Sequence, residues 1–417
     1  MIREPILKQG QFSFFEYPIR ICYTRYMLDL EKYGVNMWEE EKILSFRQKL
    51  LAWYDENKRD LPWRRSKNPY HIWVSEIMLQ QTRVDTVIPY YERFLDWFST
   101  VESLANAPEE RLLKAWEGLG YYSRVRNMQT AAQQIMNEFN GEFPSTYEGI
   151  SSLKGIGPYT AGAISSIAFN LPQPAVDGNV MRVLARLFEV NHDIGNPSNR
   201  KIFQAMMEIL IDTDRPGDFN QALMDLGSDI ESPVNPRPEE SPVKEFSAAY
   251  QNGTMHIYPI KKPKKKPTPM KWRAFIIQDD KGRFLVEKNT QADLLSGFWH
   301  FPLIRDFSTV GESIDLFEGI AEENSTYEIN QNIPLEVQFE SLYKMKLQPT
   351  RILPKTVKHI FSHQRWDIEL QCATASGPLE QHGTRTLQWV TKEEMAQLPQ
   401  SRVQGKMCEL LASQELL

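Results

Sequence analysis

Cysteine is nearly absent from this chain. Only Cys22, Cys372 and Cys408 occur in 417 residues, and they are too far apart to form a recognisable motif. So few, widely separated thiols argue against a disulfide framework and predict a protein of the reducing cytoplasm.

Long apolar runs and an excess of positive charge are also missing. No apolar run reaches the roughly 20 residues that a membrane-spanning helix needs. Glu16, Arg20 and Arg25 interrupt the N-terminal stretch, which makes it a poor signal peptide. The formal net charge is −6, so only a local basic patch could attract a polyanion. We expect no membrane partner.

The chain is longer than one ordinary domain and changes in character along its length. Residues 37–252 are dominated by the three-and-four spacing of apolar residues that is typical of helices. Residues 253–270 are rich in Lys and Pro, which predicts a solvated linker that could also contact phosphates. Residues 271–417 alternate like strands and end in two helical segments. We therefore predict an all-α domain followed by an α+β domain.

Residues 1–36 have no role that the sequence reveals. Met37 opens a clean amphipathic segment, MWEEEKILSFRQKLLAWYDEN. Translation from Met37 would leave residues 1–36 outside the protein, and the alternative is a genuine N-terminal extension.

A carboxylate lies within an apolar helix. The stretch PYHIWVSEIMLQQT, residues 69–82, is apolar nearly all round and should be buried, with Glu76 in its middle. A buried carboxylate costs free energy unless it is paired, protonated or functional. A raised pKa would suit a general acid, but a Glu paired with Arg or Lys fits the pattern equally well.

Two further segments have the form of ligand-binding turns. In LKGIGPYTAGAIS, residues 153–165, Gly155 and Gly157 permit close backbone approach, and the helix start that follows offers N–H groups to an anion. This is the form of a helix-hairpin-helix motif, although an ordinary helical turn is the alternative. In QPAVDGNVMRVLARLF, Asp177 either caps a helix or faces a substrate cation, with Asn179 placed to orient it.

Together these segments resemble the helix-hairpin-helix DNA glycosylase superfamily, and specifically the MutY-type adenine DNA glycosylases. The similar segments occur in order and at family-like spacing over most of residues 37–227. They are LPWRRSKNPYHIWVSEIMLQQTRVDTVIPYY, LKGIGPYTAGAIS, PAVDGNV and FNQALMDLG. The resemblance implies a monomeric base excision repair enzyme. Such an enzyme flips adenine mispaired with 8-oxoguanine or guanine out of duplex DNA and removes it.

The resemblance also implies catalytic roles. Glu76 matches the residue that protonates the adenine ring, and Asp177, beside Asn179, matches the carboxylate that stabilises the sugar cation. Tyr159 stands where lyase relatives carry a Schiff-base lysine, which predicts a monofunctional glycosylase.

Further positions match residues that contact DNA or the flipped base in the family. The adenine-pocket matches are Trp63, Arg64 and Gln221, and the DNA-contact matches are Gln81, Tyr121, Gly155 and Gly157. Gln81 and Tyr121 are the residues expected to wedge into the base stack beside the lesion.

The second half resembles the family's Nudix-like domain, which recognises 8-oxoguanine. Phe361, Ser362 and His363 match the loop that contacts the oxidised base, where a hydroxyl can both donate and accept; a plain turn is the alternative. The Glu-rich signature of active Nudix pyrophosphatases is missing around residues 297–323.

Most relatives hold a [4Fe–4S] cluster on four cysteines spaced by six, two and five residues. In the corresponding loop, residues 228–250, those positions are Glu231, Pro238, Ser241 and Ser247. We therefore expect no cluster and no other metal.

Two other hypotheses compete with the enzyme. A protein that binds 8-oxoguanine mispairs without cutting would explain the degenerate cluster loop, but it would not need both Glu76 and Asp177. A Nudix-type hydrolase would need phosphatase activity from the C-terminal domain.

Overall fold

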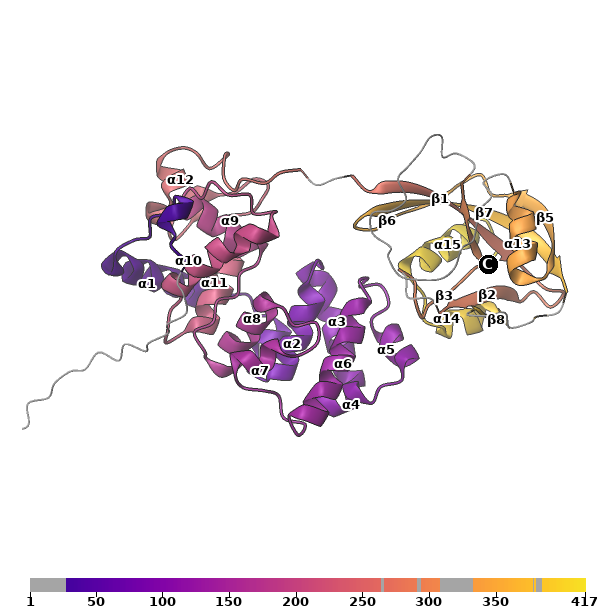
Figure 1. The fold of residues 1–417 in the computed structure, drawn as a ribbon, viewed down its shortest axis with the longest axis horizontal. Helices are drawn as coiled ribbons and strands as arrows, with labels where there is room; N and C mark the ends of the chain where they lie inside the picture. Colours follow the sequence, from indigo (N-terminus) through magenta and orange to yellow (C-terminus); the bar gives the residue numbers. More distant parts are fainter. Residues whose placement is uncertain (1–27, 264–265, 291–293, 308–332, 378, 380–384) are drawn as a thin grey trace, which may run out of the picture.

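A computed structural model describes residues 28–263, 266–290, 294–307, 333–377, 379 and 385–417. Figure 1 shows two groups of helices followed by a domain built on β-strands. The prediction of an all-α domain followed by an α+β domain is confirmed.

The first part of the chain is helical. Its helices are α1 (Glu40–Asn57), α2 (Pro69–Leu79), α3 (Val84–Trp97), α4 (Val101–Ala105), α5 (Glu109–Ala115), α6 (Ser123–Glu138), α7 (Tyr147–Ser151), α8 (Pro158–Phe169), α9 (Gly178–Leu187), α10 (Arg200–Leu210), α11 (Pro216–Asp229) and α12 (Ala248–Gln251). Some of these helices begin at a capping side chain, as α2 does. Asn68 accepts from the backbone N–H groups of Tyr70 and His71, and Pro69 occupies the first turn of α2.

These helices bury two separate apolar cores. One core is formed by the helices from α2 through α8. The other is formed by α1, α9, α10 and α11. Leu30 and Val35, upstream of Met37, are buried in the second core. The helical part therefore has two lobes, and a site between them can draw side chains from both.

Close backbone packing fixes the segment that joins α8 to α9 and the start of α9. A Cβ atom at Gly162 of α8 would lie 1.9 Å from the carbonyl oxygen of Pro174, and one at Gly227 of α11 would lie 2.8 Å from Cβ of Asn179. Only glycine fits at such distances. Gly162, in the helix that follows the hairpin, thus lets the segment that carries Asp177 lie against α8.

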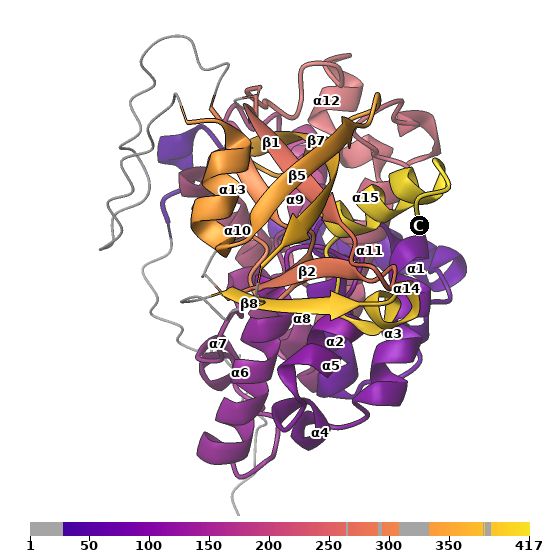
Figure 2. The ribbon, with the colours of Figure 1, turned by 90° about the vertical axis from the view of Figure 1, so that its right-hand side faces the viewer.

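The C-terminal domain contains two sheets. Its strands are β1 (Thr268–Ile277), β2 (Phe284–Asn289), β3 (Trp299–His300), β4 (Leu303–Asp306), β5 (Lys346–Ile352), β6 (Val357–Ile360), β7 (Gln364–Ser376) and β8 (Arg385–Val390). The order β4-β1-β7-β5, with β6 also on β7, forms one sheet, and β3-β2-β8 forms the other. β1 and β7 are parallel, in register from Thr268↔Gln364 to Ile277↔Ala373. Figure 2 shows β2 and β8 side by side below β1, β5 and β7.

Helices α13 (Leu335–Tyr343) and α15 (Arg402–Ala412) pack against opposite faces of the larger sheet, and α14 (Lys392–Gln397) contacts β8 of the smaller sheet. Ala274 and Ile276 of β1 face the core under α14 and α15, whereas Phe275 and Ile277 face the core under α13. This explains why β1 ends in a continuous buried run rather than an alternating one.

The C-terminal domain inserts one side chain into the helical part. Phe298 is fully buried in the core of α2 to α8, with its ring centroid 4.1 Å from that of Tyr122. Arg126 of α6 donates to the carbonyl oxygen of Ser296, and Lys288 lies 2.8 Å from Glu110. The two parts thus share an interface with an apolar centre and a charged rim.

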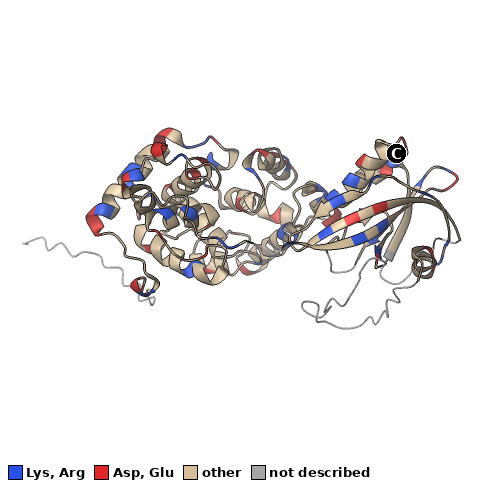
Figure 3. Cartoon of the chain, turned by 90° about the horizontal axis from the view of Figure 1, so that it is seen from above, with Lys and Arg blue, Asp and Glu red and all other residues tan. Residues whose placement is uncertain are grey.

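The predicted strands and closing helices of the second half are all present, with Phe361, Ser362 and His363 between β6 and β7. Residues 1–27 and 308–332 lie outside the described residues, and the second range includes most of the stretch 297–323 where the Nudix signature is missing from the sequence. Acidic and basic residues both occur on each part of the chain (Figure 3). No helix in the described ranges is long and apolar enough to cross a membrane.

Candidate active site

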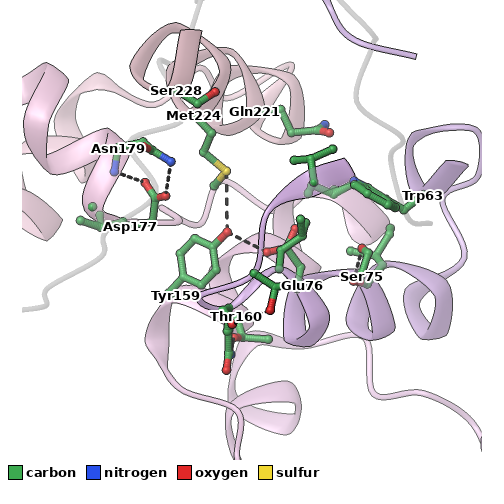
Figure 4. Close-up of a pocket in the computed structure, with 18 of the residues that line it drawn as sticks. Trp63, Ser75, Glu76, Tyr159, Thr160, Asp177, Asn179, Gln221, Met224 and Ser228 are labelled. Carbon is green, nitrogen blue, oxygen red and sulfur yellow. Dashed lines mark hydrogen bonds between the residues drawn. The ribbon is translucent and has the colours of Figure 1, made fainter. Parts of the chain in front are cut away.

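A cavity of about 670 Å³ lies between the two helical lobes. Most of the residues predicted for the site line it. They are Trp63, Arg64, Glu76, Gln81, Gly155, Gly157, Tyr159, Asp177, Asn179 and Gln221. Segments up to about 160 residues apart in the chain therefore converge on one chamber, shown in Figure 4.

Glu76 is buried in this chamber with a hydroxyl partner. Only 6% of the residue is exposed, and its Oε2 accepts a hydrogen bond of 2.7 Å from the Tyr159 hydroxyl (Figure 4). Burial raises the pKa of Glu76 to about 7, the charge of Asp177 adds to this rise, and the Tyr159 bond opposes it. Neither an Arg nor a Lys forms an ion pair with Glu76 in the described structure. Of the two readings left open by the sequence, the general acid fits and the ion-paired glutamate does not.

Asp177 is both a helix cap and a pocket carboxylate. Its Oδ1 accepts from the backbone N–H groups of Asn179 and Val180 at 2.9 and 2.8 Å, and its Oδ2 accepts from the Asn179 side-chain amide at 2.8 Å. Burial raises the pKa of Asp177, and these N–H groups limit the rise. Asp177 thus accepts three N–H donors, whereas Glu76 accepts one hydroxyl, so the two carboxyl groups lie in different environments, as an acid and a cation stabiliser require.

Asn179 is itself held in place. Arg182, one turn further along α9, donates from Nη2 to Asn179 Oδ1 at 2.7 Å. The amide therefore turns its nitrogen toward Asp177, as expected for a residue that orients the carboxylate.

Arg64 lines the cavity, and its guanidinium forms an ion pair with Asp225. Its two terminal nitrogens donate to the two oxygens of Asp225 at 2.7 and 3.0 Å, and Arg59 donates to the same carboxylate. This bidentate pair fixes the guanidinium in the pocket wall. Trp63 is buried beside it, with its ring edge-on to Tyr91 at 5.4 Å.

Gln221 and the two expected wedge residues are more accessible. Gln221 donates to the carbonyl oxygen of Gly217 on its own helix and lines the cavity beside Met224 and Ser228 (Figure 4). Gln81 is exposed at the cavity rim, and Tyr121 is 46% exposed outside it.

The predicted oxoguanine loop lies in the C-terminal domain. Phe361 packs on Trp366 and His359, with ring centroids 4.8 and 4.5 Å away, so it anchors the turn. Ser362 and His363 are exposed at its tip, with Ser362 Oγ 3.3 Å from His363 Nδ1.

The loop of residues 228–250, which corresponds to the expected cluster position, has no set of side chains that could bind an iron–sulfur cluster. At the four expected positions, Glu231 pairs with Arg186 at 2.7 Å, Pro238 has no donor, Ser241 is buried and Ser247 caps α12. No group of three or more His, Cys, Asp or Glu side chains among the described residues is arranged to hold a metal ion. Thiolates are the ligands of such clusters, and this loop supplies none.

Three contributors were not predicted from the sequence. Met224 lies with its sulfur 3.7 Å from the Tyr159 hydroxyl, Asp225 anchors Arg64, and Arg182 orients Asn179. Two signals were available, since Asp225 is an acid on a largely buried helix and Arg182 lies on an apolar helix. Met224 gave no signal beyond its place in FNQALMDLG.

Comparison with known proteins identifies the class that this fold and pocket define. Residues 74–210 match the model of the HhH-GPD superfamily of base excision DNA repair proteins, and residues 273–410 match a NUDIX domain. The chain is 39% identical over 260 residues to an adenine DNA glycosylase of Buchnera aphidicola, an alignment of 62% of this chain and 74% of that protein. It belongs to the adenine DNA glycosylase family of base excision repair enzymes.

Other relatives align over different shares of their length. An adenine DNA glycosylase of Schizosaccharomyces pombe is 30% identical over 93% of this chain and 91% of its own length. That of Arabidopsis thaliana is 38% identical over 64% of this chain, and the match spans about half (49%) of the plant protein.

Proposed function

We propose that this protein removes adenine mispaired with 8-oxoguanine, or with guanine, from duplex DNA by hydrolysing the N-glycosidic bond. The observation that carries the proposal is the buried Glu76, with a pKa of about 7, in the same chamber as the capped Asp177. The cavity is large enough for one flipped base.

The chemistry follows from the two environments. Protonated Glu76 gives its proton to a ring nitrogen of adenine, and the C1′–N9 bond breaks with its electron pair leaving on the base. Ionised Asp177 stabilises the positive charge that develops on the sugar. Water then adds to C1′ and loses a proton, which leaves an abasic site and free adenine.

The reaction is monofunctional in this proposal. A strand-cleaving glycosylase needs an amine at the sugar. Position 159 instead holds a tyrosine, whose hydroxyl donates a hydrogen bond to Glu76. No lysine lines the cavity within the described residues, and Lys154 is exposed outside it.

Binding groups support DNA as the partner. Gly155 has φ +79° and Gly157 caps α8 without a side chain, so the hairpin leaves backbone N–H groups accessible to a phosphate. Ser362 and His363, exposed between β6 and β7, supply donors and acceptors for the oxidised base. Gln81 and Tyr121 enter the base stack.

A single-turnover assay on an 8-oxoguanine:adenine duplex tests this function. Wild type should release adenine without cutting the strand, and Glu76→Gln or Asp177→Asn should slow release by about 10²–10⁴-fold. A guanine:adenine duplex and a thymine:adenine duplex serve as matched substrates. Tight mispair binding by wild type without any release would favour the non-catalytic binder instead.

We also propose that the protein works without an iron–sulfur cluster. Protein purified from iron-supplemented cells should contain no stoichiometric iron or sulfide and show no broad visible absorption. Stoichiometric iron in active protein would contradict the proposal.

A further inference from the structure

Arg124, in the first turn of α6, binds the C-terminal end of the helix that carries Glu76. Its Nη1 donates to the carbonyl oxygens of Ile77 at 2.7 Å and Gln80 at 2.6 Å, with Met78 further away at 3.3 Å. Carbonyls at a helix C-terminus lack partners within the helix and carry partial negative charge, so a cation is stabilising there.

The other side of the same guanidinium binds a second loop. Nη2 of Arg124 donates to the carbonyl oxygens of Leu119 and Gly120 at 3.1 and 3.0 Å, in the turn between α5 and α6. One planar cation therefore joins two loops whose acceptors are about 40 residues apart in the chain.

Each loop continues directly into a residue with a strained backbone. Gln81 has φ +61° and follows Gln80, while Tyr121 has φ +49° and follows Gly120. Left-handed conformations are unfavourable for non-glycine residues and persist where the surroundings enforce them. The carbonyls of Gln80 and Gly120 belong to the peptide planes that immediately precede these two φ angles. By holding both planes, Arg124 fixes the direction in which each side chain leaves its loop.

The environment keeps Arg124 available for this task. No carboxylate pairs with it in the described parts of the chain, so the carbonyl oxygens are its acceptors. Its guanidinium carbon also lies 5.5 Å from the ring centroid of Tyr121 and 5.4 Å from that of Trp116. Burial lowers the pKa of Arg124 to about 10, which leaves it charged at neutral pH.

We propose that Arg124 is a positioning residue that sets Gln81 and Tyr121 at a fixed spacing, so that both side chains enter the duplex together at the mispair. The inference rests on the proposed function, which assigns these two residues to the base stack. Lysine cannot replace arginine here, because its single nitrogen cannot reach both sets of carbonyls in one plane.

Hydrogen exchange, measured without DNA, tests whether Arg124 holds the two loops in place. Arg124→Lys should speed amide exchange in residues 80–84 and 118–123 together, and Arg124→Gln, with one donor group, should release at least one of the two loops. Arg111→Lys is the control, since Arg111 lies over the rings of Trp97 and Phe98 away from both loops. Unchanged exchange in both loops of both Arg124 variants would show that Arg124 does not hold the loops and would overturn the proposal.

Mispair binding tests its role in recognition. The preference for an 8-oxoguanine:adenine duplex over a matched duplex should fall about tenfold in Arg124→Lys, because the stacking of a side chain on a base is weakened. In a Gln81→Ala/Tyr121→Ala background the same substitution should change the preference little, since Arg124 acts through those residues. Its full effect in that background would show a merely structural role and overturn the proposal.

The two experiments separate this inference from the function it rests on. A wild-type protein that neither releases adenine nor prefers the mispair overturns the proposed function and the DNA role of Arg124. A wild type that excises adenine, beside an Arg124→Lys variant with unchanged exchange and preference, overturns the positioning role alone.

Discussion

Arg186 and Glu231 form a buried ion pair that ties α9 to the loop of residues 228–250. Their Nη1 and Oε2 atoms are 2.7 Å apart, and the two side chains are only 4% and 5% exposed. Arg186 also donates to the carbonyl oxygens of Glu231 and Ser232, and the Ser247 hydroxyl donates to the carbonyl oxygen of Arg186. With Val243 and Phe246 buried in the core of α9 to α11, these contacts fix both ends of the loop.

Removing one partner should therefore destabilise the helical part. Glu231→Ala leaves the Arg186 charge buried without its carboxylate, which costs about 3–5 kcal/mol in comparable cases. Chemical denaturation followed by circular dichroism would measure the loss. Glu245→Ala is the matched control, because Glu245 pairs with Lys49 at the surface of the same loop and such pairs are worth about 0–1 kcal/mol. Equal losses in the two variants would show that the buried pair does not hold the loop.

The pH dependence of adenine release should report Glu76. A general acid acts in its protonated form, so the single-turnover rate should fall as pH rises through the Glu76 pKa of about 7. Tyr159→Phe removes the hydrogen bond that lowers this pKa, so the fall should move to higher pH in that variant. Rates from pH 5 to pH 9 would show the shift. A basic limb that does not move in Tyr159→Phe would contradict the assignment of Glu76 as the titrating acid.

The same pKa predicts a stability cost. A carboxyl group whose pKa rises from 4.5 when unfolded to about 7 when folded favours folding below pH 4.5, and this advantage is lost as pH rises through 7. The rise corresponds to about 3 kcal/mol. Glu76→Gln carries no charge to bury, so its free energy of unfolding should exceed that of wild type by more at pH 8 than at pH 5. Denaturation of both proteins at the two pH values measures the difference, and a gap independent of pH would contradict it.

How much of this site the sequence could predict depends on the kind of contact. Glu76, Tyr159 and Asp177 lie in continuous motifs, so resemblance located them, and local caps such as Asp177 at the start of α9 follow from capping rules. The Arg64–Asp225 and Arg124–Ile77 contacts join segments about 160 and 50 residues apart. Periodicity carries no information on such pairing, because it depends on how the helices pack. The choice between an ion-paired and a protonated Glu76 depends on how deeply the side chain is buried and on which residues surround it. Both are properties of the assembled core and cannot be derived from the helix sequence alone.

Phe298 offers a test of how the two parts of the chain depend on each other. Its ring is fully buried among helices of the other part and lies 4.1 Å from the ring of Tyr122, the chain neighbour of Tyr121. Phe298→Ala should lower the stabilising free energy of this interface by about 3–5 kcal/mol, as cavity-forming substitutions do. Among the described residues, Phe298 is the one from the C-terminal domain that belongs to the core of α2 to α8, so thermal unfolding followed by calorimetry should split into separate helical and C-terminal transitions. Leu294→Ala, in the same loop but 37% exposed, should leave the profile nearly unchanged. If Phe298→Ala unfolds like wild type, the two parts are stable independently of this contact.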